Sequence, residues 1–515
     1  MKKVRKMTFP PRQRLLFLMF CMAAPWYGPA QIPLNILDFG AVAGGNTLNT
    51  AAIQAAIDKA GQAGGGRVLV PAGVFLSGSV HLKSGVELHL AEGATLLGST
   101  SRFDYDKITW HALVLAKEQE NIAITGPGAI DGQGAALAAD VVRLVQEGKI
   151  VDPYWGNNRP HERERPQLIE LVRCKNVRVS GPRLTNSACW VQTYQECDGL
   201  LLENLRVESR AYWNNDGIDL VDCRNVHVRG CDINAADDGI CLKTSFPPSF
   251  CDSILIEDCT VRSSASALKF GTSSYSGFRN VRVRKLRVFD TYRSAVALEI
   301  VDGGFMEHIE VSDIVAKNTG NAIFIRLGHR TQQRPAGSIR DIRIHDVTVE
   351  VPNARPDAGY AFEGPAVTEP HNLIPSSITG IPGYPVRDVS LENIHIRFGG
   401  GALRERAHLS LDSLDKVPER IKDYPEFSMF GELPAWGFYV RHVEGLTMKN
   451  IRLECAAPDF RPALVFDDVQ GLALRRIRIS GGNNAPALVM QRVAEPVLKK
   501  VKADGSTATV LDLTN

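Results

Sequence analysis

A short apolar repeat runs through most of this 515-residue chain and restricts its fold more than any other feature. Each copy reads apolar-x-apolar-x-x-apolar-x-apolar. Copies begin at Val177, Leu200, Val226, Ile254 and Val281, at intervals of 23 to 28 residues. Apolar residues two positions apart indicate strands with one buried face, whereas a helix would need a period of 3.6. The repeat therefore predicts short strands that recur once per unit.

A unit of this size cannot bury its own apolar face, so it must stack on its neighbours. Later copies follow at wider intervals, which indicates insertions between the same units; they begin at Ile309, Ile342, Val389, Leu446 and Leu472. Parallel stacking places equivalent residues about 4.8 Å apart. We therefore predict an all-β fold, a single-stranded parallel β-helix over residues 31–515, instead of the two to four domains that the length alone would suggest.

The repeat is absent at three places, which we expect to have other structures. Residues 49–57 show helical periodicity behind an Asn-Thr capping pair, and they are predicted to form a helix that closes the N-terminal end. Residues 133–167 and 399–437 are rich in Pro, Gly, aromatic and charged residues. We predict that both are long loops over one flank of the solenoid, and loops this long are usually functional.

Residues 1–30 have the composition of a secretory signal peptide. Six cations and no acid accompany a short apolar run, Leu15 to Ala24, which precedes the small-residue site Gly28-Pro29-Ala30. About ten apolar residues are too few to span a bilayer. We therefore expect an exported protein, periplasmic or extracellular, without a membrane span.

The formal net charge of +2 depends on this segment. Without its six cations, 53 Lys and Arg face 57 acids, which gives −4. A nearly neutral chain has no general attraction for nucleic acid.

Nine cysteines remain after residue 30. Their repeated placement predicts buried stacks of cysteine side chains in preference to disulfide bridges. Their spacing does not match that of a zinc site.

Acidic residues gather in two turns that the repeat places on neighbouring coils. Asp216 lies about one repeat before Asp237 and Asp238, so the three carboxylates are expected to lie close together. Three carboxylates in contact cannot all ionise cheaply, and one is expected to stay protonated. Hydrolysis of a glycosidic bond needs such a division, because a neutral acid protonates the leaving oxygen while a carboxylate activates water.

Spacing alone leaves two other interpretations of these acids open. Asp-Gly and Asn-Asp pairs are common turn formers, so the acids could serve the turns alone. Clustered carboxylate oxygens also suit a calcium ion.

At these acids the sequence resembles glycoside hydrolase family 28, the polygalacturonase family of right-handed parallel β-helices. The family's Asn-Thr-Asp motif corresponds to Asn214-Asn215-Asp216, and its Asp-Asp motif to Asp237-Asp238. Further matching segments are Asp38-Phe39-Gly40-Ala41, residues 64–68 and Pro71-Ala72-Gly73. The resemblance implies that Asp237 is the general acid and that Asp216 and Asp238 hold and deprotonate the water. It also implies inversion of the anomeric configuration and no metal or other cofactor.

Two family motifs have no match in this chain. Where Gly-His-Gly is expected, the chain has residues 266–272, which include Lys269; where Arg-Ile-Lys is expected to grip a uronate carboxylate, it has Ala297-Leu298-Glu299. Lys269, Arg293 and Arg326 are the cations we expect to bind substrate instead, together with Asn214. A basic cluster in the first long loop, Arg159, His161, Arg163 and Arg165, suits either an anionic sugar or plain surface.

These features predict an exported inverting glycosidase that acts on pectic or related plant cell-wall polysaccharide or its oligosaccharides. We expect the long insertions to block one end of the groove and to favour removal of terminal sugars. The expected partner is the glycan, and the chain is expected to be a monomer. Two alternatives stay open: a polysaccharide lyase on the same fold, and a non-catalytic glycan-binding β-helix.

Overall fold

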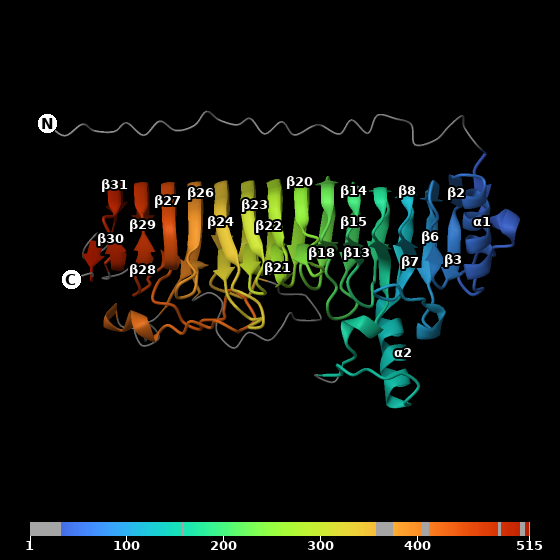
Figure 1. Ribbon diagram of the computed structural model, residues 1–515, viewed down its shortest axis with the longest axis horizontal. Coiled ribbons are helices and arrows are strands. Elements are labelled where there is room, and N and C mark those ends of the chain that lie inside the picture. Colours follow the sequence, from blue (N-terminus) through green and yellow to red (C-terminus); the bar gives the residue numbers. More distant parts are fainter. Residues whose placement is uncertain are drawn as a thin grey trace.

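The computed structural model describes residues 32–156, 159–356, 374–402, 411–482, 486–504 and 510–513. The predicted signal peptide, residues 1–30, lies outside the described residues, as does part of the second predicted loop. Strands are the main secondary structure of the described chain, and its coils stack into one elongated solenoid (Figure 1). All pairs between named strands are parallel, as the repeat predicts. No described helix is long and apolar enough to cross a membrane.

The predicted repeat forms one continuous ladder, which we call the first ladder. Val177 pairs with Leu200, Leu200 with Val226, and Val226 with Ile254, so the predicted register is confirmed. The ladder comprises β2 (Gly66–Val70), β5 (Val86–Leu90), β8 (Glu120–Thr125), β11 (Lys175–Ser180), β14 (Asp198–Glu203), β17 (Arg224–Arg229), β20 (Cys251–Ser263), β22 (Gly277–Ile300), β23 (Phe305–Leu327), β24 (Ser338–Val351), β26 (Val386–Gly400), β27 (Phe438–Ala457), β29 (Ala473–Ser480) and β31 (Val497–Ala503). β1 (Leu34–Asn35) pairs with β2 at its start.

Two further ladders complete each coil. The second ladder comprises β4 (Val80–His81), β7 (Ala112–Lys117), β10 (Gln167–Val172), β13 (Gln192–Gln195), β16 (Ile218–Val221), β19 (Ile240–Thr244), β21 (Leu268–Ser274), the later parts of β22 and β23, β25 (Ser376–Thr379), the first part of β27, β28 (Leu464–Gln470), β30 (Leu488–Ala494) and β32 (Val510–Asp512). The third begins with β3 (Gly73–Ser77), β6 (Ala94–Gly98), β9 (Ala129–Asp131), β12 (Arg183–Thr185), β15 (Arg206–Ser209) and β18 (Asp232–Ala235), and continues in the long strands.

The inward side chains of all three ladders make a single apolar core along the solenoid. It extends from Ile36 to Val493. The nine cysteines from Cys174 to Cys455 are free and buried, as their repeated placement predicts. Small polarizable side chains fill such positions without voids.

Helix α1 (Thr50–Gln62) lies at the N-terminal end of the stack, beyond β2 (Figure 1). It contacts β2, β4 and β5 through its apolar face, which includes Ile53 and Ile57. The helix begins after Asn49 as predicted, but the prediction that the Asn49 side chain caps it is wrong, because that side chain makes no capping hydrogen bond. It binds the backbone of Val42, Thr47 and Leu76 instead.

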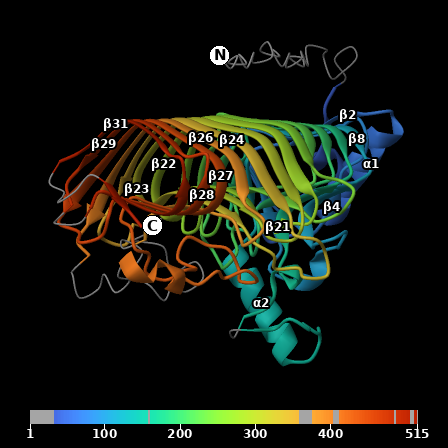
Figure 2. The ribbon, with the colours of Figure 1, turned by 60° about the vertical axis from the view of Figure 1, so that its left-hand side comes forward.

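The first insertion, residues 133–167, was predicted to be a loop, but it contains helices. It contains α2 (Gly134–Gln146) and a short 3-10 helix, Glu162–Glu164, and Figure 2 shows α2 projecting away from the coils. The second insertion, 399–437, carries the 3-10 helix Leu411–Lys416 and lies on the same side of the solenoid in Figure 1. Two other short 3-10 helices occur at Ile36–Phe39 and Arg102–Asp104.

Candidate active site

The three predicted acids meet at the start of two neighbouring strands of the second ladder. Asp216 precedes β16 and Asp238 precedes β19, and the pairing of Ile218 with Ile240 brings them side by side. Oxygens of Asp216 and Asp238 and the sulfur of Cys241 all lie within 4.8 Å of one another. The repeat therefore placed these acids correctly, on adjacent coils.

Asp216 is held by a buried lysine that sequence reasoning missed. Nζ of Lys243 donates to Oδ2 of Asp216 at 3.0 Å, and it also contacts Asp219. The ammonium lies 3.9 Å from the ring centroid of Trp190, a favourable cation–π contact. Lys243 thus contacts two buried acids and one aromatic ring.

A second lysine holds Asp238. Nζ of Lys269 lies 3.0 Å from Oδ2 of Asp238 and donates to Oη of Tyr424 at 3.1 Å. The backbone N–H of Ser266 donates to the other oxygen, Oδ1, at 3.0 Å. Ser266 stands where the family's histidine is expected, so here a backbone group and a lysine fix the carboxylate. Lys269 therefore lies in the site as predicted, but it contacts an acid.

Asp237 differs from its two neighbours, because it is partly exposed and makes no ion pair within the part of the chain that the structure describes. Its Oδ2 accepts a hydrogen bond from Nδ2 of Asn214 at 3.4 Å, and its Oδ1 accepts from the Asp238 N–H at 2.9 Å. Asn214 has a φ of 57°, a left-handed conformation that Asn tolerates well. Its Oδ1 accepts from the buried guanidinium of Arg165 at 2.7 Å.

These environments shift the pKa values of the three acids by different amounts. Burial, and next the charge of Asp238, raises the pKa of Asp237. Burial also raises the pKa of Asp216 well above its usual range, against the attraction of Lys243. Burial alone would raise the pKa of Asp238 too, but Lys269 and then Arg293 lower it below its usual value. The site can therefore hold a proton on Asp237 while Asp238 stays ionised.

The same arrangement bears on the calcium alternative. Asp216 and Asp238, the acids that could share a cation, each have a lysine ammonium at 3.0 Å. The lysines already balance the charge that a divalent ion would need. A water between the two carboxylates fits the chemistry of this site better than a metal does.

The two other cations predicted to bind substrate are both engaged by residues of the second insertion. Arg293 is 2% exposed, and its guanidinium lies 3.2 Å from Glu426 of the second insertion. Arg326 is 1% exposed and donates to the backbone carbonyls of Gly380, Glu419 and Arg420. No contact described for Arg326 reaches the acids. Its observed role is to anchor the insertion, which corrects its expected place in the site.

Glu299, which occupies the place of the family's motif lysine, is also buried. Burial raises its pKa to about 8, against the attraction of Lys269. A carboxyl group at this position cannot supply the positive charge with which a lysine would bind a substrate carboxylate.

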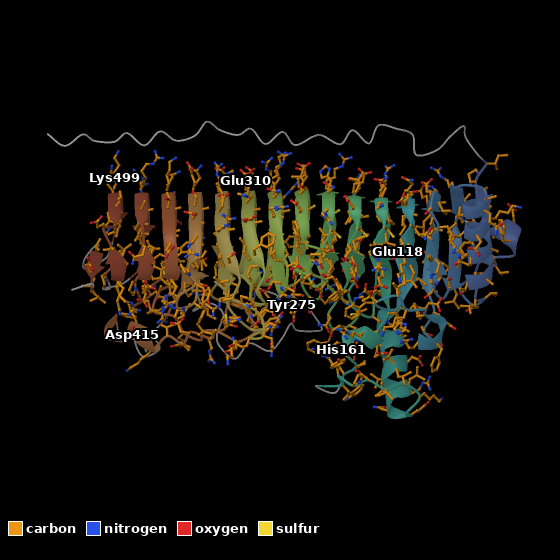
Figure 3. The ribbon with its side chains drawn as sticks, viewed as in Figure 1. Glu118, His161, Tyr275, Glu310, Asp415 and Lys499 are labelled. Atoms are coloured by element: carbon orange, nitrogen blue, oxygen red, sulfur yellow. The ribbon has the colours of Figure 1, made fainter. Side chains whose placement is uncertain are left out.

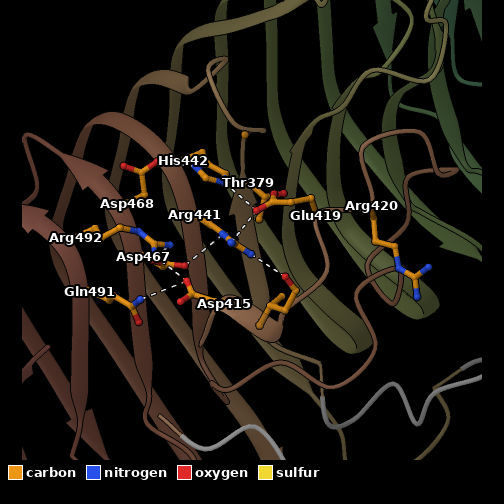
Figure 4. A network of polar contacts seen from close by, with 12 residues as sticks. Thr379, Asp415, Glu419, Arg420, Arg441, His442, Asp467, Asp468, Gln491 and Arg492 are labelled. Carbon is orange, nitrogen blue, oxygen red and sulfur yellow. Dashed lines mark hydrogen bonds and ion pairs between the residues drawn. The ribbon is translucent and has the colours of Figure 1, made fainter. Parts of the chain in front are cut away.

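A polar network attaches the second insertion to the solenoid (Figure 4). Arg441 of β27 donates to the Val417 carbonyl at 2.8 Å and pairs with Glu419 at 2.7 Å. Arg492 pairs with Asp415 at 2.8 Å. An apolar cluster lies beside this network and includes Phe324, Phe427, Phe430, Tyr439 and Val465. The insertion is thus packed against the second ladder, and it brings Tyr424 and Glu426 to the site.

The first insertion reaches the site from the other direction. Arg165 is 1% exposed and donates to the carbonyls of Ala188 and Trp213 as well as to Asn214. Arg159 lies over the Trp213 ring, 4.5 Å from its centroid. The predicted basic cluster is therefore partly structural and partly at the edge of the site.

Fold and site together define a β-helical protein with the side chains that glycoside hydrolysis needs. The chain belongs to glycosyl hydrolases family 28, whose sequence profile matches residues 61–355. A probable polygalacturonase of Vitis vinifera is 26% identical over 336 residues, 61% of this chain and 60% of that protein. An exo-poly-alpha-D-galacturonosidase of Dickeya chrysanthemi is 27% identical over 249 residues, 40% of this chain and 41% of that protein. The chain thus matches less than two thirds of the length of either relative.

Solved structures share the fold. The exopolygalacturonase of Thermotoga maritima superposes with a TM-score of 0.59 at 23% identity, covering 82% of this chain and 93% of that one. The family 28 exopolygalacturonase of Yersinia enterocolitica superposes with a TM-score of 0.55 at 20% identity, covering 92% and 79%. At these identities the likeness concerns the architecture.

Proposed function

We propose that this protein is an exported inverting glycosidase that removes sugars from pectic polysaccharide or its oligosaccharides. The observation that carries the proposal is the electrostatic difference between Asp237 and Asp238. Asp237 is partly exposed, without an ion pair in the described chain, and has a raised pKa, whereas Asp238 is paired with Lys269 and has a lowered one. Family membership and the names of the matched relatives support a pectic substrate.

In the proposed reaction, Asp237 gives its proton to the glycosidic oxygen as the bond between that oxygen and the anomeric carbon breaks. A water held between Asp216 and Asp238 attacks the anomeric carbon from the opposite side. Asp238 takes the proton from this water, because its pKa is the lowered one, and Asp216 orients the water. The product has the inverted configuration.

We propose that the enzyme acts on chain ends. The two insertions flank the acids, with Asn214 held by Arg165 on one side and Lys269 contacting Tyr424 on the other. The name of the Dickeya relative, an exo-acting enzyme, is consistent with this. Release of monosaccharides or disaccharides from the first time point would support exo action, whereas a rapid fall in polymer size would contradict it.

The central experiment compares the wild type with Asp237→Asn on a panel of pectic polysaccharides and oligosaccharides. Loss of general acid catalysis is expected to lower kcat by about 100-fold to 10,000-fold. Proton NMR of the first product should show the inverted anomer. Full activity of Asp237→Asn, a retained configuration, or unsaturated products that absorb in the ultraviolet would each refute the assignment. Exposed Lys175→Gln is the control and should be fully active.

Export by residues 1–30 is part of the proposal. Expression of the full chain in a bacterial host, followed by N-terminal sequencing of protein from the periplasm and the medium, tests it. A mature chain that starts at Gln31 is expected, and an uncleaved cytoplasmic product would contradict export.

A further inference from the structure

The cations around Asp237 decide whether the site can hold an acidic sugar. Among the described residues, the cations that interact electrostatically with Asp237 include Arg159, Lys243, Lys269 and Arg293. Three of them already have carboxylate partners, since Lys243 pairs with Asp216, Lys269 with Asp238 and Arg293 with Glu426. These three are also almost fully buried. They can balance the charge of the site, but they cannot offer a new ion pair without losing an existing one.

Arg159 is the exception within the described chain. It makes no ion pair there, and it is partly exposed. Its guanidinium lies 4.5 Å from the centre of the Trp213 ring, and its backbone is fixed by paired hydrogen bonds with Gly156, at 3.0 and 3.4 Å. Trp213 directly precedes Asn214, which contacts Asp237. A partly exposed cation therefore stands at the edge of the site, close to the proposed general acid.

The surroundings of Arg159 favour an added anion. Burial and then the neighbouring cation Arg165 lower the pKa of Arg159, while Asp237 and Glu162 raise it. A guanidinium that is partly stripped of water and repelled by a second arginine gains more from an anion than a solvated surface arginine does. If Asp237 carries a proton, as the proposed function requires, its carboxyl group is neutral and no longer balances the positive charge of Arg159.

We propose that Arg159 binds a carboxylate of the substrate, so that the glycan held beside Asp237 contains a uronic acid. This inference rests on the proposed function. Arginine suits the task because its planar fork binds both oxygens of a carboxylate. The cation comes from the first insertion, and it takes over a role for which Lys269, Arg293 and Arg326 are not available.

Binding to inactive protein tests the proposal apart from catalysis. The background variant is Asp237→Asn, and the probes are a galacturonic acid oligosaccharide and the same oligosaccharide fully methyl-esterified. Titration calorimetry of the background variant should show tighter binding of the acidic probe, by about tenfold to one-hundredfold. Adding Arg159→Gln should abolish this preference while leaving affinity for the esterified probe unchanged.

Two further variants separate charge from structure. Arg159→Lys keeps the positive charge, so it should retain part of the preference for the acidic probe. If Arg159 served the structure alone, the charge of the replacement would not matter and the preference would not return. Arg163→Gln removes the same charge from an exposed arginine that lies over Trp110 and Tyr154, and it should leave the preference intact.

The outcomes distinguish this proposal from the proposed function. Equal affinity for both probes, binding of neither, or an unchanged preference in the Arg159→Gln variant would overturn the role of Arg159. Full hydrolytic activity of Asp237→Asn would overturn the proposed function, whatever the titrations show.

Discussion

Lysines decide how the individual acids of this site behave. Asp238 and Asp216 are both buried, and each has a lysine at 3.0 Å. Among the described acids, Lys269 pairs with Asp238 alone, whereas Lys243 is shared between Asp216 and Asp219. Burial raises the pKa of Asp219 to about 6. A whole positive charge lowers a carboxyl pKa more than a shared one. This explains why Asp238 is the better base of the two.

Replacing Lys269 by Met should therefore shift the pH profile. The pKa of Asp238 is lowered chiefly by Lys269, so it rises when the ammonium is removed. The base must be ionised to act, and the acidic limb of kcat/KM is expected to move to higher pH. Activity at the optimum should fall by up to about 100-fold. The measurement is kcat/KM from pH 3 to pH 9 on an oligosaccharide that the wild type hydrolyses.

Lys269→Arg is the matched control, because it keeps the charge beside Asp238. Its acidic limb should stay near that of the wild type even if kcat falls. An unshifted limb in Lys269→Met would show that Asp238 is not the group that titrates in the reaction.

At the scale of elements, ladders were predictable and insertions were not. The register of Val177, Leu200 and Val226 follows from a period of two and a fixed unit length, and it places Asp216 beside Asp238. Lys243 could have been found in the same way, since it lies on β19 one coil after Val221. The insertions have no repeat to fix their path, so the positions of Tyr424 and Glu426 did not follow from the sequence.

Helix α2 shows what local sequence still reveals inside an insertion. Its buried residues Leu137, Ala138, Val141 and Leu144 have helical spacing. Its packing was not predictable, however, and neither was the engagement of Arg326 and Arg293 by the second insertion. Charge alone identified both arginines as candidate binding residues, but it could not show that tertiary contacts already occupy them.

Phe427 is expected to control whether the second insertion keeps its place. It is 1% exposed and belongs to the apolar cluster beneath the insertion. Phe427→Ala should cost about 3–5 kcal/mol of local packing, and the insertion should loosen while the solenoid stays folded. Because Tyr424 and Glu426 depend on it, kcat/KM should fall at least about tenfold.

Limited proteolysis with mass spectrometry measures this effect, together with thermal unfolding. New cleavage between residues 411 and 437 is expected, with little change in the unfolding of the strands. Tyr384→Ala, at a residue that is 48% exposed, should change neither quantity. Uncut Phe427→Ala protein with lost activity would instead indicate a direct role of Phe427 at the site.

At the scale of the whole molecule, one column of outward side chains on the first ladder carries charges of alternating sign over four consecutive coils. This column contains Glu203, Arg229, Glu257 and Arg284, each opposite the next. Arg229 forms an ion pair with Glu203, and Arg284 forms one with Glu257, both at 2.6 Å. At the last coils the same column carries three cations in succession, Lys449, Arg475 and Lys499. Figure 3 shows Lys499 on the side of the solenoid opposite to the insertion residues His161 and Asp415.

A neighbouring column repeats the pattern, since Arg452, Arg478 and Lys502 are also in register. Arg475, Arg478, Lys499 and Lys502 are exposed and make no ion pair within the described residues. Like charges directly opposite each other destabilise a strand pair. The C-terminal coils should therefore be the least stable part of the stack, because each unit of a solenoid is stabilised only by its neighbours.

Restoring the alternation should stabilise these coils. The double variant Lys499→Glu/Lys502→Glu places an acid opposite Arg475 and Arg478 and turns two repulsions into attractions. The gain should be about 1 kcal/mol in low salt, from two cross-strand pairs. It should shrink in about 1 M salt, where the Debye length is about 3 Å. Hydrogen exchange of the β29 and β31 amides is the suitable measurement, because a solenoid need not unfold in one step.

The control reverses the sign of the change. Lys175 lies opposite Glu120 toward the N-terminal end of the stack and pairs with it at 3.1 Å, so Lys175→Glu creates a repulsion where the native chain has an attraction. That variant should speed exchange in β8 and β11 in low salt and have less effect in high salt. If the terminal double variant also sped exchange, or if its effect did not depend on salt, charge repulsion would not be what weakens the last coils.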